Sequence, residues 1–205
     1  MHVAVTFSGL PRSPLRGLYS WEGLIAEYNA DVFMHLWDTG DGAAERLVDI
    51  FQPVKHVIEP LRFFDTSSYA DRLQHSNPFN VFSMWTSISE SINLALSHDR
   101  HYDLIVRART DVEFNPFKFL NVYGVVIPGK PAEVYEYQGN RYPGWHDMMA
   151  YGDPASMRTY ANTLYALPEI YAEGSPFFSE FFLSTHLFRT KTNTTHHAVF
   201  ADVTR

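Results

Sequence analysis

Apolar and polar residues along this chain form patterns that predict strands and helices in turn. The first apolar run, at residues 2–8, ends at Gly9 and Pro11, as a buried strand does when a loop follows it. Apolar side chains then recur every three to four residues over 15–28, which is the spacing of an amphipathic helix. The next elements predicted in this way are a strand at 31–37, a helix at 43–51 and a strand at 54–58.

The same patterns predict alternating elements in the rest of the chain. The longest helical pattern covers 80–97, and it leads into the β-branched run 104–106, which is typical of a central parallel strand. Further strands are predicted at 122–127, 132–137, 147–151 and 198–203, and further helices at 154–171 and 176–189. This order indicates an α/β fold with a mostly parallel central sheet flanked by helices. Ligands of such sheets gather beyond the carboxyl ends of the strands, which draws attention to the loop after Thr110.

Length and composition indicate one globular domain without a covalent scaffold. The chain has 205 residues, of which 45% are hydrophobic, and such a chain can bury enough apolar surface to fold without disulfides. It contains no cysteine, so thiolate zinc sites and cysteine nucleophiles are excluded. No repeat or low-complexity linker divides the sequence, and residues 1–205 are therefore treated as a single domain.

Net charge and hydropathy restrict the partners. The formal net charge of -7 disfavours nucleic acid as a ligand, because affinity for nucleic acid depends largely on Lys and Arg. No apolar run approaches the length of about eighteen residues that a membrane-spanning helix needs, and the first residues do not have the pattern of a signal peptide. We therefore expect a cytoplasmic protein without an integral membrane segment, whose oligomeric state the sequence does not define.

The segment 107–114 has the most specific chemistry. If it is extended, Arg107, Arg109, Asp111 and Glu113 project from one face, because side chains two residues apart share a face of a strand. Carboxylates are ligands that Mg²⁺ and Mn²⁺ prefer, and arginines bind diphosphate in a forked geometry. The alternative interpretation is an internal salt-bridge network at the end of a strand. The spacing alone does not decide between them.

Three segments in this order resemble bacterial and viral surface-polysaccharide glycosyltransferases of the GT-A type. They are FSGLPR at 7–12, DVFMHLWD at 31–38 and YDLIVRARTD at 102–111. The resemblance implies one GT-A domain, in which residues 1–114 bind the nucleotide sugar and residues 115–205 form the acceptor side. It also implies an enzyme that moves a sugar from a nucleotide-diphosphate donor to a glycan or polysaccharide acceptor. Because this group has viral members, the resemblance is also compatible with an enzyme that a virus encodes and that acts in the host cell.

The resemblance also implies roles for individual residues on the donor side. Asp111-Val112-Glu113 matches the position of the Asp-X-Asp motif of GT-A enzymes, which binds Mn²⁺ or Mg²⁺ together with the sugar nucleotide. Glu113 departs from the commoner aspartate and keeps the carboxylate. The residues expected to contact the sugar nucleotide are Ser8, Gly9, Arg12, Arg107, Arg109 and Asp111.

On the acceptor side, the resemblance points to Asp147 as the catalytic or acceptor-orienting carboxylate and to Glu180 as the second candidate for the base. His196 is expected as a third metal ligand. Each has a plainer interpretation, as a turn aspartate, a solvated helix charge and a surface histidine respectively. Trp145 is the aromatic residue expected at the acceptor site, where its ring could stack on a sugar.

Two other functions are compatible with the same residues. A nucleotidyltransferase would use a similar α/β architecture and carboxylates, but the glycine-rich, lysine-bearing loop that usually binds its triphosphate is missing from the sequence. A non-enzymatic carbohydrate-binding or virion-associated module would use the aromatic residues to bind sugar, and the acidic pair would then be structural.

Overall fold

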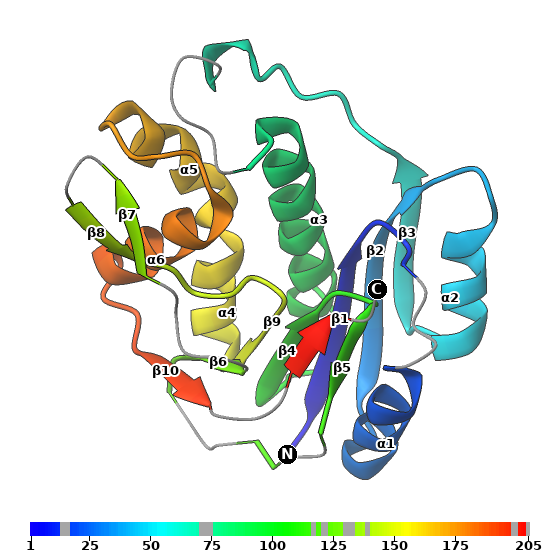
Figure 1. Ribbon diagram of the computed structural model, residues 1–205. Helices are drawn as coiled ribbons and strands as arrows, with labels where there is room; N and C mark the ends of the chain where they lie inside the picture. Colours follow the sequence, from blue (N-terminus) through cyan, green and yellow to red (C-terminus); the bar gives the residue numbers. More distant parts are fainter. Residues whose placement is uncertain are drawn as a thin grey trace.

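The computed structural model describes residues 1–12, 17–69, 76–115, 118–119, 123–128, 134–137, 140–197 and 201–203, with 134–137, 140–143 and 201–203 described through their backbone only. Its central sheet (Figure 1) contains β1 (Val3–Gly9), β2 (Asp31–Asp38), β3 (Lys55–Pro60), β4 (Leu104–Ala108), β6 (Val125–Pro128), β9 (Met149–Gly152) and β10 (Thr194–His197). The order across the sheet is β10-β6-β9-β4-β1-β2-β3. β9 is antiparallel to both of its neighbours, and the remaining pairs are parallel.

Six helices cover the two faces of this sheet. They are α1 (Leu18–Tyr28), α2 (Ala43–Phe51), α3 (Pro78–Leu96), α4 (Pro154–Ala161), α5 (Thr163–Ala172) and α6 (Ser179–Arg189), and a short 3-10 helix η1 (Ser67–Tyr69) precedes α3. Apolar residues of α3, α4, α5 and α6 form one core with one face of the sheet, and those of α1 and α2 form a second core on the opposite face. Alternate residues of each strand enter opposite cores, as Ala4 and Val5 of β1 do.

Two pairs of short strands lie outside the central sheet. β5 (Val112–Phe114) pairs antiparallel with β11 (Ala201–Val203), and β7 (Val134–Tyr137) pairs with β8 (Asn140–Pro143) as a hairpin. The β5–β11 pair connects the segment after β4 with the end of the described chain. Val112 and Phe114 are buried in the core beside α1, and the indole N–H of Trp21 donates to the Val112 carbonyl at 2.9 Å.

The order of the strands creates a switch point between β1 and β4. From β1 the chain proceeds outward through β2 to β3, and α3 then returns it to β4 on the opposite side of β1. At such a point the connections leave the sheet in opposite directions, so the carboxyl ends of the two strands border a crevice. The crevice of this protein is therefore expected beyond Gly9 and Ala108.

The patterns in the sequence predict most of these elements correctly. The alternating opening and the mostly parallel sheet are confirmed, and α2 has the predicted bounds. The single helix predicted over 154–171 is wrong, because α4 ends at Ala161 and α5 begins at Thr163, with Asn162 as the cap residue between them. Asn is a residue whose side chain competes for backbone hydrogen bonds, which favours helix ends. Of the predicted elements, residues 15–16, 122, 132–133 and 198–200 lie outside the described residues.

Candidate functional site

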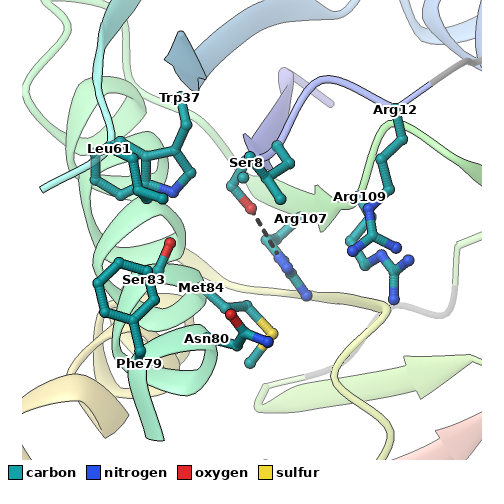
Figure 2. Close-up of a pocket in the computed structure, with 12 residues that line it drawn as sticks. Ser8, Arg12, Trp37, Leu61, Phe79, Asn80, Ser83, Met84, Arg107 and Arg109 are labelled. Atoms are coloured by element: carbon teal, nitrogen blue, oxygen red, sulfur yellow. Dashed lines mark hydrogen bonds between the residues drawn. The ribbon is translucent and has the colours of Figure 1, made fainter. Parts of the chain in front are cut away.

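A pocket of about 200 Å³ lies at the switch point, beyond the carboxyl ends of β1 and β4. Figure 2 shows the two kinds of side chain that line it, with three arginines on one side and apolar groups from α3 and the ends of β2 and β3 on the other. The lining residues are Ser8, Gly9, Leu10, Arg12, Trp37, Leu61, Phe79, Asn80, Ser83, Met84, Arg107 and Arg109. Five of the residues expected to contact a sugar nucleotide are therefore together, and Asp111 is in direct contact with two of them.

Arg107 is the most unusual residue of this pocket. It belongs to β4 and is 0% exposed, although its guanidinium carries a charge. Its Nε donates to Ser8 Oγ at 3.3 Å, and its Nη1 donates to the backbone carbonyl of Asp147. Within the described residues, Nη2 has no acceptor and no carboxylate forms an ion pair with this side chain. Burial lowers the pKa of the Arg107 guanidinium, while the nearby Tyr160 and Asp147 oppose that effect.

Arg12 and Arg109 converge on a single carboxylate. Arg109 donates from Nε and Nη2 to the two oxygens of Asp111, at 2.9 and 2.7 Å, and Arg12 Nη1 lies 3.3 Å from the same carboxylate. The Asp111 side chain is only 5% exposed. The backbone also ties the two loops together, because Arg12 N donates to Thr110 Oγ1 and Thr110 Oγ1 donates to Arg12 O, both at 3.1 Å. The loop after β1 and the loop after β4 thus form one unit.

The condition that 107–114 is one extended segment is not met beyond Ala108. β4 ends at that residue, and Thr110 and Asp111 form a turn in which Val112 N donates to Arg109 O at 3.4 Å. Buried Thr110 bonds to the loop after β1, and this contact stabilises the turn. The turn directs Asp111 back onto Arg109, whereas Glu113 follows on β5, with its neighbours Val112 and Phe114 facing the core.

The three residues expected to hold a metal do not form one cluster. Asp111 is bound by two guanidinium groups, Glu113 is half-buried on β5, and His196 lies on the edge strand β10 opposite Ile127. Among the described residues, no group of three His, Asp or Glu side chains is positioned to hold a metal ion. The described side chains therefore do not assemble the three-residue metal site that the resemblance implies.

The acceptor-side candidates lie near the arginine side of the site and along α6. Asp147 precedes β9, and its backbone carbonyl accepts from Arg107. Glu180 lies in the first turn of α6, where its carbonyl accepts from Ser184 Oγ at 2.9 Å. Ser184 Oγ in turn accepts from the backbone N–H of Trp145 at 3.0 Å. The loop that carries Trp145 and Asp147 is thus fastened to α6 at one end and to Arg107 at the other.

The apolar wall of the pocket was largely missed by the sequence patterns. Trp37 lies one residue before the end of β2, and its indole N–H is buried without an acceptor among the described residues. Phe79, Asn80, Ser83 and Met84 come from the first turns of α3. Asn77 caps this helix by accepting from Phe79 N at 2.9 Å, and the cap places the helix start at the mouth of the pocket. An N-cap followed by Pro78 was the available signal for this boundary.

Compared with known proteins, the chain matches no protein-family model and no curated protein sequence. No helix in the described part of the chain is long and apolar enough to span a membrane.

Proposed function

We propose that this protein is a glycosyltransferase that moves a sugar from a nucleotide-diphosphate donor to a glycan or polysaccharide acceptor. The observation that carries the proposal is the fully buried guanidinium of Arg107, which forms no ion pair with a carboxylate among the described residues and lies at the switch point of the sheet. A buried charge is costly unless an opposite charge compensates it. An anionic ligand in the pocket would supply that charge, and Arg12 and Arg109 would contribute to binding it.

The two walls of the pocket fit the two ends of a nucleotide diphosphate. Three guanidinium groups on one wall match a diphosphate, because each presents several N–H donors in a plane and remains charged at neutral pH. On the other wall, Trp37, Phe79 and Met84 offer apolar surface for a flat base, and Asn80 offers both a donor and an acceptor. This combination supports a nucleotide rather than an isolated phosphate.

The residues around this pocket suggest how transfer would proceed. The acceptor oxygen forms a bond to the anomeric carbon, and the bond from that carbon to the diphosphate oxygen breaks. The arginines stabilise the negative charge that develops on the departing diphosphate. The acceptor's hydroxyl proton passes to a base, for which Asp147 is the first candidate because its loop adjoins Arg107, and Glu180 is the second.

The dependence on Mn²⁺ or Mg²⁺ that the resemblance implies can be separated from the arginine contacts by two variants. If Asp111 mainly positions Arg12 and Arg109, Asp111→Asn weakens binding of a nucleotide diphosphate equally with manganese and with a chelator. If Asp111 binds the metal, the variant loses affinity only when manganese is present. Glu113→Gln, measured by calorimetry under the same two conditions, reports on the second carboxylate, which has no arginine partner among the described contacts.

A thermal-shift screen tests the proposed function directly. We expect a nucleotide diphosphate and its sugar derivative to raise the Tm by several degrees at saturating concentration, because a ligand at one hundred times its Kd contributes about 2.7 kcal/mol to stability. Mass spectrometry of reactions with glycan acceptors then detects sugar transfer. Stabilisation by carbohydrates alone would instead indicate a binding module, and stabilisation by nucleoside triphosphates with release of pyrophosphate would indicate a nucleotidyltransferase.

A further inference from the structure

A buried hydrogen-bond network lies directly behind the pocket and involves none of the residues discussed so far except Gly9 and Trp37. Its centre is the hydroxyl of Ser87 on α3, which is 0% exposed. Gly9 N donates to Ser87 Oγ at 2.6 Å, and the hydroxyl lies 2.7 Å from the carbonyl of His35. The Nδ1 of the same histidine is 2.9 Å away. One serine hydroxyl thus contacts the end of β1, the backbone of β2 and a buried imidazole.

The imidazole extends the network to the surface. His35 is 1% exposed, and its Nε2 lies 2.9 Å from Glu59 Oε1 on β3. Arg62 Nη2 lies 2.7 Å from the same carboxylate oxygen, and Arg62 Nη1 lies 3.3 Å from Glu90 of α3. Glu59, Glu90 and Arg62 are the charged groups that act on this histidine. The carboxylate of Glu59 can only accept, so Nε2 of His35 carries a proton.

The groups around Ser87 leave its hydroxyl one role at the pocket, which is to accept a hydrogen bond from Gly9 N–H. Its single hydrogen points to one of two acceptors, the carbonyl of His35 or an unprotonated Nδ1. In both arrangements a lone pair remains for Gly9 N–H. The contact with Gly9 therefore persists whichever way the hydroxyl is turned, and His35 holds the oxygen in place.

The contact with Gly9 determines the direction of the chain where it enters the pocket. Gly9 lines the pocket and has a φ of +103°, a backbone conformation that residues other than glycine rarely adopt. Three residues later, Arg12 faces Asp111. The His35 ring also packs edge-on against Trp37, with ring centres 4.9 Å apart. The network thus supports both walls of the pocket, one through Gly9 and the other through Trp37.

We propose that Ser87 is a positioning residue for ligand binding: its hydroxyl, held by His35 and Glu59, fixes the Gly9 peptide and through it the loop that carries Arg12. The side chain of Ser87 does not line the pocket, so it acts through Gly9 rather than on the ligand. This inference rests on the proposed function in one respect, namely that the ligand is a diphosphate.

The test compares Ser87→Ala with Ser91→Ala, one turn further along α3. Both serines are 0% exposed, but Ser91 Oγ donates only to the Ile88 carbonyl of its own helix, at 3.0 Å. Calorimetry with inorganic pyrophosphate and with UDP should show affinity about tenfold lower for Ser87→Ala, which is the typical effect of one buried hydrogen bond, and little change for Ser91→Ala. Equal affinities in all three proteins, or equal losses in both variants, would overturn the proposal.

Amide hydrogen exchange supplies a measurement that does not depend on ligand binding. Gly9 N–H should exchange slowly in the unmodified protein and faster in Ser87→Ala, with unchanged rates in the centre of β1. Fast exchange of Gly9 in the unmodified protein contradicts the proposal even if the variant does not fold. If neither pyrophosphate nor UDP binds to any of the proteins, the proposed function fails, while the exchange of Gly9 still decides whether Ser87 fixes this peptide.

Discussion

Arg107 illustrates at the scale of one residue how stability and binding are opposed. Its guanidinium is fully buried, and its hydrogen bonds to Ser8 and Asp147 are made to uncharged oxygens. Removing the charge relieves a desolvation cost of several kcal/mol but also deletes these bonds. We therefore expect Arg107→Met to keep the free energy of unfolding within about 1 kcal/mol of the unmodified value, and to weaken pyrophosphate binding at least about tenfold.

Urea unfolding and calorimetry on the same preparations measure the two effects, and Arg158→Met serves as the control. Arg158 is exposed on α4, its side chain forms no hydrogen bond or ion pair within the described part of the chain, and it does not line the pocket. A loss of several kcal/mol in Arg107→Met would show that the residue is structural. Unchanged affinity for pyrophosphate would remove the main support for an anion site.

The sequence predicts the arginines of the site but not how they are arranged. Arg107, Arg109 and Asp111 are close in space because they are close in the chain, but the turn at Thr110, in which Asp111 accepts from Arg109, replaces the expected extended segment. That turn depends on a contact with Arg12, which is 98 residues away in the chain. The Ser87–His35 contact also spans two elements, and no spacing in the sequence indicates it.

The insertion of β9 into the sheet requires two glycines to approach closely. A Cβ atom on Gly152 would lie 2.2 Å from the carbonyl oxygen of Gly124, which is backbone and cannot rotate away. Gly152→Ala should therefore destabilise the protein by more than about 2 kcal/mol in urea unfolding. Gly23→Ala is the matched control, because nothing lies within 4 Å and the site is an exposed helix interior. There we expect stabilisation of about 0.5–1 kcal/mol. Equal effects at both positions would contradict this account.

A carboxylate anchors the start of β2 to the segment that leads into β4. Asp31 accepts from Tyr102 Oη at 2.7 Å and from Arg100 Nη1 at 2.9 Å. Burial alone would raise the pKa of Asp31, but the hydrogen bonds from Tyr102 and Arg100 hold it below its usual value. A lowered pKa in the folded state means that the contribution to stability is full above the unfolded pKa of about 3.9 and disappears as the pH falls through the folded value.

It follows that Asp31→Asn should cost about 1–2 kcal/mol at pH 7 and progressively less below about pH 4. Urea unfolding at a series of pH values measures the difference. Asp99→Asn, in the exposed turn before Arg100, should have little effect at any pH. A loss for Asp31→Asn that is constant from pH 7 to pH 2 would mean that packing, rather than charge, accounts for it.

Among the elements, the strands that the sequence predicts well are those that both cores bury. β1 and β4 are buried along nearly their whole length, so their apolar runs are continuous. β10 consists of two threonines and two histidines, and β5 has three residues. Their strand conformation comes from pairing with β6 and β11, partners that are distant in the chain. Local patterns cannot predict pairing of this kind.

At the scale of the whole molecule, the two predicted halves both contribute residues to the hydrophobic cores. The core on the α3 side combines Ala4 and Phe33 of the first half with Ile170, Phe182 and other residues of the second. The sheet is also continuous across the boundary, since β4 pairs with both β1 and β9. Residues 1–114 alone would therefore expose apolar surface that residues 115–205 now cover.

We therefore expect urea to unfold this protein in one transition. Tryptophan fluorescence reports on Trp21, Trp37 and Trp85 in the first half and on Trp145 in the second, and far-UV circular dichroism reports on the helices of both. The two signals should coincide, and Gly152→Ala, at the junction of β9 and β6, should shift both by the same amount.

Two separate transitions, with only the second sensitive to Gly152→Ala, would show that the halves fold independently. In that case the pocket, whose arginines all lie in the first half, could retain pyrophosphate binding after the second half has unfolded. With a single transition, binding is lost together with the fold, because Arg107 depends on the Asp147 carbonyl and is buried only when both halves are in place.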